Sequence, residues 1–174
     1  MSIGRAAAVR MPGAPFSVAA NLRRAREILD APPALPHIER PEPIGELVAE
    51  FVLPLELCQP FNRIGRAGTA SAGWALGKLK QSAYLCMWQQ AGGRRTNPLP
   101  GRPHILCCRF SSVEPDHDSG WTKNPVDRLR VGRNGLGFIV DDKPRSVKLS
   151  AWWEPVPPRH GFVLVGVFTG EASR

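Results

Sequence analysis

Residues 104–110 have the sequence HILCCRF, an apolar run that ends a few residues before the acidic stretch 115-PDHD-118. A short apolar run of this kind predicts a buried strand. Such a strand would deliver Asp116 and Asp118 to its carboxyl end. If this stretch is extended, both carboxylates point to one face and His117 points to the other.

Patterns on both sides of this strand predict the other elements. Apolar residues recur at helical spacing before Gly92-Gly93, and Asn124-Pro125 suggests an asparagine cap with proline in the first turn of a second helix. The predicted elements are a strand at 48–57, a helix at 70–90, the strand at 104–110, a helix at 124–131, and strands at 146–153 and 162–168. This order predicts a mixed β-sheet of about four strands with two main helices packed on it, in the α/β or α+β class.

The first 45 residues differ in composition from the rest of the chain. They are rich in proline, alanine and arginine, and only residues 18–29 could form a helix. Segments of this composition bury too little apolar surface to fold alone, which predicts a flexible arm holding one short helix. The folded domain is therefore expected at residues 46–174.

The charge balance is strongly basic. Lys and Arg outnumber Asp and Glu by 23 to 15, a formal net charge of +8, and from Arg94 onward the count is 13 to 8. Such an excess suits an anionic partner, either nucleic acid or an acidic membrane surface, although a merely soluble basic protein has the same composition. No stretch predicts a membrane span or a secretory signal.

The four cysteines indicate thiols rather than a zinc site or a disulfide framework. Cys58, Cys86, Cys107 and Cys108 lie in apolar segments, and their spacing fits no zinc motif. We expect them to be buried and reduced, in the cytoplasm of a bacterial or phage-infected cell.

Two acidic motifs and one lysine could carry chemistry. Asp116 and Asp118 form a D-x-D pair, Asp141 and Asp142 end the apolar run 138–140, and Lys123 stands between the two motifs. Carboxylate oxygens are the ligands that Mg²⁺ and Mn²⁺ prefer. The alternative is that D-x-D is a solvated loop and that Asp141-Asp142-Lys143 is a turn in which an aspartate acts as a cap.

In order along the chain, these residues resemble the RusA family of Holliday junction resolvases. The resemblance covers about residues 51–169. Its motifs are Pro60-Phe61-Asn62, Asp116-His117-Asp118, Lys123-Asn124-Pro125-Val126-Asp127 and Gly137-Phe138-Ile139-Val140-Asp141-Asp142. The chain differs from the family pattern at Ser119, where the family has asparagine, and in the longer spacing from Asp118 to Lys123.

The resemblance implies a homodimeric endonuclease that cuts four-way junctions and other branched DNA with Mg²⁺ or Mn²⁺, in DNA recombination and repair. By that resemblance Asp116, Asp118 and Asp142 bind the catalytic metal and Lys123 is the essential lysine. Asp141, also at the metal, and Asp127 are supporting residues. The basic residues expected to contact DNA are Arg63, Arg66, Arg94, Arg95, Arg102, Arg130, Arg133 and Lys143.

Two other functions stay open at the level of sequence. One is a catalytically silent protein of the same fold that binds branched DNA. The other is a basic structural protein whose aspartates form surface ion pairs and whose binding to DNA falls steeply with salt.

Overall fold

The computed structural model describes residues 16–59, 70–116 and 120–171. Its sheet has the strand order β1-β4-β2-β3. The strands are β1 (Leu47–Pro54), β2 (Arg102–Ser111), β3 (Lys148–Pro155) and β4 (Phe162–Glu171). β2 is parallel to β3 and antiparallel to β4, which is antiparallel to β1. The predicted mixed sheet is confirmed.

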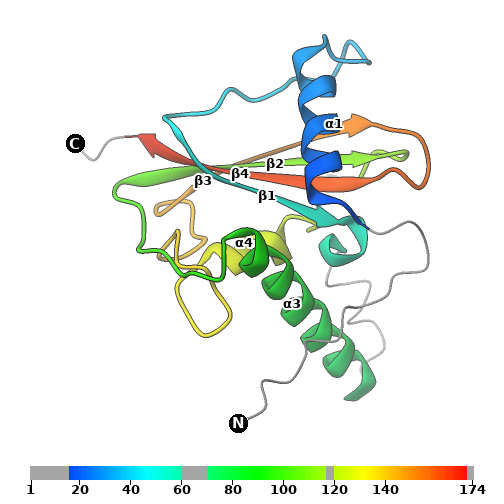
Figure 1. Ribbon diagram of the computed structural model, residues 1–174. Helices are drawn as coiled ribbons and strands as arrows, with labels where there is room; N and C mark the ends of the chain where they lie inside the picture. Colours follow the sequence, from blue (N-terminus) through cyan, green and yellow to red (C-terminus); the bar gives the residue numbers. More distant parts are fainter. Residues whose placement is uncertain (1–15, 60–69, 117–119, 172–174) are drawn as a thin grey trace.

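The helices cover both faces of this sheet, which gives an α+β architecture (Figure 1). α1 (Val18–Asp30) lies on one face, whereas α3 (Ala70–Gln90) and α4 (Lys123–Leu129) lie on the other. A short 3₁₀ helix, η1 (Leu55–Cys58), follows β1. Within the described ranges, no helix has both the length and the apolar character needed to cross a bilayer.

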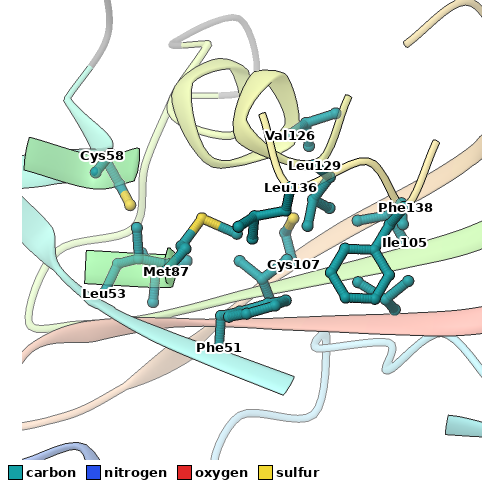
Figure 2. Packing of buried hydrophobic residues seen from close by; sticks show 14 of the residues in the cluster. Phe51, Leu53, Cys58, Met87, Ile105, Cys107, Val126, Leu129, Leu136 and Phe138 are labelled. Atoms are coloured by element: carbon teal, nitrogen blue, oxygen red, sulfur yellow. The ribbon is translucent and has the colours of Figure 1, made fainter. Parts of the chain in front are cut away.

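β2 is the central buried strand that its apolar sequence predicts. Ile105 and Cys107 belong to the core beneath α3 and α4, while Cys108 and Phe110 belong to the core beneath α1. A strand covered on both faces has no solvent-facing side, so its sequence is apolar without alternation. Figure 2 shows the first of these cores, in which side chains of the sheet pack against Met87 of α3 and Leu129 of α4.

The cysteines are free thiols, as predicted. Cys58, Cys107 and Cys108 are buried and Cys86 is half-buried. Burial raises the pKa of the Cys107 thiol to about 12, because the charged thiolate is disfavoured away from water. These thiols are therefore protonated parts of the core.

The described part of the N-terminal region is packed on the domain, although its composition suggested a flexible arm. α1 starts after Ser17, whose hydroxyl accepts a hydrogen bond from Ala20 N at 3.2 Å. Its inner face packs against the sheet, and Ala25 is fully buried there. The few apolar residues of α1 are enough to hold the helix on the sheet, because they lie on one face of the helix and the sheet covers that face.

Arg40 ties α1 to the sheet. Its Nε lies 2.5 Å from Glu154 Oε1 on β3, and its Nη2 lies 3.2 Å from Glu154 Oε2. The same guanidinium donates to the carbonyls of Ile28, Leu29 and Ala31 at the end of α1. Glu154 is fully buried, so Arg40 both neutralises a buried carboxylate and caps a helix.

His104 of β2, like Arg40, connects the segment before β1 to the sheet. Its Nδ1 accepts a hydrogen bond from Ile44 N at 3.1 Å, and its Nε2 lies 2.9 Å from Ser150 Oγ on β3. Because Nδ1 is an acceptor, the ring is neutral with its proton on Nε2. Burial lowers the pKa of His104, with further lowering from Lys148 and Arg102 and an opposing effect from Glu171.

The predicted asparagine cap of α4 is wrong. The N-cap is Thr122, and Asn124 lies inside the first turn, where it is completely buried. Its side-chain amide donates to Leu57 O at 2.8 Å and to Leu79 O at 3.4 Å. Asn124 thus joins α4 to η1 and α3, a role that only the tertiary packing reveals.

We predict that Arg40→Met lowers the free energy of unfolding by about 3–5 kcal/mol, because it leaves the buried Glu154 carboxylate with the hydrogen bond from Trp152 Nε1 but without a cation to balance its charge. Arg26→Met is the matched control on a surface ion pair. Arg26 lies 2.6 Å from Glu50 and is 62% exposed, so its loss should cost less than about 1 kcal/mol. Urea unfolding at neutral pH measures both, and equal losses would contradict the structural role given to Arg40.

We also predict that stability falls as the pH drops below about 6.5, the ordinary pKa of histidine in an unfolded chain. His104 stays neutral in the folded state, whereas the unfolded state binds a proton. The free energy of unfolding therefore falls by up to about 1.4 kcal/mol per pH unit until the pH reaches the lowered pKa of His104. His104→Gln should flatten this dependence in urea unfolding. A pH dependence that stays the same in His104→Gln would contradict the role given to His104.

Candidate functional site

A cluster of charged side chains forms where α4 begins. Lys123 Nζ lies 2.5 Å from Asp142 Oδ2 and 3.0 Å from Asp127 Oδ1. Asp127 is one helical turn after Lys123, whereas Asp142 comes from the loop before β3. The structure therefore brings together two of the predicted catalytic residues, Lys123 and Asp142, with the predicted supporting residue Asp127.

Arg130 completes this cluster from the end of α4. Its Nη1 lies 3.4 Å from Asp142 Oδ1 and 3.8 Å from Asp127 Oδ1. Two carboxylates thus face two cationic side chains, and the side chains of Asp127 and Asp142 are only 13% and 23% exposed. Partial burial reduces screening by water, so these charges interact more strongly than a surface pair.

The packing of α4 and of the loop after it fixes this geometry. Asn124 anchors the first turn, and Val126 and Leu129 are buried in the core. After the helix, Val131 N donates to Ile139 O at 2.9 Å and Ile139 N donates to Leu129 O at 3.1 Å. The chain therefore returns to α4 just before Asp142.

Gly137 allows this return. Its φ is +93°, a backbone conformation that residues with a side chain rarely adopt. A Cβ at this position would also collide with the carbonyl oxygen of Thr96. The glycine lets the loop lie directly on the segment that precedes β2.

The close pairing shifts the pKa values of both Lys123 and Asp142. The hydrogen bond from Lys123 lowers the pKa of Asp142, and the same hydrogen bond raises the pKa of Lys123. Lys123 therefore stays an ammonium and Asp142 a carboxylate over a wide pH range.

Asp141 has a different role from its neighbour. It faces solvent, and its Oδ1 accepts a hydrogen bond from the backbone N of Lys143 at 3.0 Å. A hydrogen bond with the Ser146 side chain and this backbone bond lower its pKa. Asp141 therefore stabilises the turn before β3, as the alternative interpretation of Asp141-Asp142-Lys143 predicted for one of these aspartates.

Asp116 lies in a separate hollow of about 210 Å³. It is exposed, and Trp121, Trp152 and Trp153 form part of the same hollow. Over the described ranges no three His, Cys, Asp or Glu side chains form a group that could hold a metal ion. Asp118, the other half of the D-x-D pair, lies outside the described residues.

The basic residues predicted to contact DNA divide into three groups. Arg94, Arg95, Arg133 and Lys143 are exposed. Arg130 belongs to the charged cluster, and Arg102 is half-buried with its Nε donating to Pro144 O at 2.9 Å. Arg63 and Arg66 lie outside the described residues.

Sequence reasoning missed that Arg130 contacts the carboxylates. It was expected to contact phosphate, yet it is three residues after Asp127 and seven after Lys123, so it lies on the same side of the helical segment. That spacing was the available signal. The contact with Asp142 depends on the folded-back loop and had no signal in the sequence.

We predict that Lys123→Met raises the pKa of the Asp142 carboxyl, because the substitution removes the hydrogen bond that most favours the charged form. An NMR titration of the side-chain carboxyl carbons measures the shift. Lys143→Met removes an exposed lysine close in sequence and should leave the Asp142 titration unchanged. An unchanged pKa in Lys123→Met would show that the pair does not form in solution.

Comparisons with family models, with curated proteins and with solved structures found no match to this chain. The resemblance to the RusA family therefore depends on the residues quoted above. A function for this chain has to be proposed from the geometry of the charged cluster and from those motifs.

Proposed function

We propose that this chain is a Mg²⁺-dependent endodeoxyribonuclease that hydrolyses phosphodiester bonds in branched DNA, with four-way junctions as its substrate. The observation that carries the proposal is the contact between Lys123 and Asp142, 19 residues apart in sequence and 2.5 Å apart in space. The resemblance assigns both to one catalytic site, and Asp127 of the same motif joins them.

The donor set suits a hard divalent cation. The Lys123 ammonium lies between carboxylate oxygens of Asp127 and Asp142, so this position already favours positive charge. Oxygen donors are those that Mg²⁺ prefers, and Mn²⁺ accepts them as well. By the resemblance, Asp142 would hold the ion together with Asp116, which lies in the separate hollow, and with Asp118, which lies outside the described residues. When bound, such an ion lowers the pKa of a coordinated water and offsets charge on the phosphate.

Lys123 would act on the phosphate itself. It stays protonated because of its carboxylate partners, and its side chain is 47% exposed, so it can reach a bound strand. A fixed ammonium next to the scissile phosphate stabilises the extra negative charge of the transition state. The basic excess of the chain supplies affinity for the DNA backbone.

A homodimer fits this substrate. A four-way junction has approximate two-fold symmetry, and paired symmetric cuts require two active sites related in the same way. We therefore propose that two copies of the chain bind one junction.

One observation favours a second candidate, a catalytically silent protein that binds branched DNA. Both oxygens of Asp142 already face cationic groups of the protein, Lys123 Nζ on one side and Arg130 Nη1 on the other. Because these cations already balance the charge of the Asp142 carboxylate, DNA phosphates could bind close to it without a metal ion. Cleavage distinguishes the two candidates.

We predict that the wild-type chain nicks a synthetic four-way junction in Mg²⁺ and not in EDTA. Asp142→Asn should reduce the cleavage rate at least about 100-fold, beyond the 10–100-fold cost of losing a residue that only supports a metal ligand. Asp141→Asn is the matched comparison, because the amide oxygen of asparagine can still accept the hydrogen bond from Lys143 N. It should retain most of the activity.

Two outcomes would contradict the proposal. Tight binding of the junction without nicks, in Mg²⁺ and in Mn²⁺, would establish the silent binding protein instead. Equal losses in Asp141→Asn and Asp142→Asn would show that the contact with Lys123 does not define the site. Thermal unfolding of each variant checks that the loss of activity is not a loss of fold.

A further inference from the structure

Two of the acid-free segments of the chain each carry three arginines. Residues 94–102 contain three arginines, and residues 128–140 contain three more, and neither segment has an Asp or Glu. The six are Arg94, Arg95, Arg102, Arg128, Arg130 and Arg133. Positive charge that has no acidic neighbour along its own segment attracts an external anion unless tertiary contacts neutralise it.

The two segments lie side by side in the fold. Thr96 N donates to Leu136 O at 2.8 Å, and Leu99 N donates to Phe138 O at 2.9 Å. Arg95 Nη2 donates to the backbone oxygen of Arg133 at 2.6 Å. The exposed arginines of both segments, Arg94, Arg95 and Arg133, therefore belong to one region of the surface.

Tertiary contacts account for only some of these arginines. Arg128 is buried and donates to Asn134 O, and Arg102 donates to Pro144 O. Arg94 and Arg133 are exposed, and within the described ranges neither guanidinium has a hydrogen bond or an ion pair. We call Arg94, Arg95 and Arg133 the arginine surface.

A hollow of about 350 Å³ adjoins this surface. Its volume is in the range of small-ligand sites, about 300–1,000 Å³. Arg94 and Arg95 line it together with the apolar side chains of Ala49, Phe51 and Phe138. Glu50 also lines it, but its carboxylate is paired with Arg26.

The loop that carries Arg133 also carries Arg130 of the charged cluster. Arg133 is three residues after Arg130, which contacts Asp142. A strand whose phosphates are bound by Arg133, Arg95 and Arg94 would therefore extend from Asp142 towards the hollow. A hollow with both polar and apolar lining, flanked by arginines, matches the two parts of a nucleotide, a base and a phosphate.

We propose that the arginine surface binds the phosphates of the DNA strand next to the cut site, and that the hollow receives one unpaired nucleotide of that strand. This assignment rests on the proposed function for the identity of the strand as DNA. It adds a binding path that distinguishes Arg94, Arg95 and Arg133 from the other basic residues of the chain. A base pair opens at lower cost at a branch point, where stacking is interrupted, than within a perfect duplex.

Fluorescence anisotropy with labelled oligo-dT and with a labelled four-way junction tests the proposal in EDTA, where no cleavage interferes. Arg94→Gln/Arg133→Gln removes two charges that make no contact within the described ranges. Two lost phosphate contacts at a salt slope of about 0.7 each should weaken oligo-dT binding roughly 25-fold near 0.1 M salt and flatten the slope by about 1.4. Arg94→Lys/Arg133→Lys keeps the charges and should restore most of the affinity.

Arg23→Gln/Arg159→Gln is the control that removes two exposed arginines elsewhere, one of them on α1 across the sheet. If this pair weakens binding as much as Arg94→Gln/Arg133→Gln, the arginine surface is not a specific path and the proposal is wrong. The hollow is tested by Ala49→Ile, which places a larger side chain in it and should weaken oligo-dT binding about fivefold or more. Unchanged affinity in Ala49→Ile would exclude a nucleotide from the hollow.

The result is separable from the test of nuclease activity. If the arginine variants lose affinity as expected while the wild-type chain never cuts a junction, the binding path stands and the nuclease proposal fails. If the wild-type chain cuts and the arginine variants bind like the control pair, only the binding path fails.

Discussion

The central strand β2 is buried on both faces, and the rest of the structure follows from the need to cover it. Its residues alternate between two cores, one beneath α3 and α4 and the other beneath α1. Each covering layer has polar groups that must be satisfied where it meets the sheet. Arg40 satisfies them beneath α1, where it pairs with the buried Glu154 and caps the helix. Asn124 has the same function on the other face, where it joins α4 to η1 and α3.

The position of the charged cluster is a consequence of this packing. Because Asn124, Val126 and Leu129 hold α4 against the core, Lys123 at its start and Arg130 just after its end have fixed positions. The loop that follows is bonded back onto the helix, which brings Asp142 between these two cations. Neither acidic nor basic side chains dominate, so the cluster is balanced in charge. That balance is why the same geometry suits a catalytic site and, without a metal ion, a silent binding site.

Charge is distributed over the surface in a way that complements the cluster. The loop that carries Arg130 of the balanced cluster also carries Arg133, and Arg94, Arg95 and Arg133 are exposed on segments that contain no acid. Under the proposed function, a DNA strand bound there would reach the carboxylates through an attractive field, and the repulsion between carboxylates and phosphates would be confined to the proposed site of cutting. The hollow beside Phe51 and Phe138 gives this region an apolar component, which a purely electrostatic surface lacks.

The sequence by itself determined the mixed sheet, the helix at residues 70–90 and the buried thiols, because apolar periodicity over a whole element is a strong local signal. The ordered motifs of the family resemblance predicted one site for Lys123, Asp127, Asp142, Asp116 and Asp118. The structure brings the first three together, whereas Asp116 lies in a separate hollow. Tertiary structure alone decided the roles of single side chains. Asp141 and Asp142 are adjacent and chemically identical, yet one caps a turn and the other pairs with Lys123. Asn124 is an anchor instead of a cap, and α1 is a layer of the fold although its composition resembles an arm. Such roles depend on which backbone groups another segment leaves unsatisfied, and that is fixed only when distant segments come into contact.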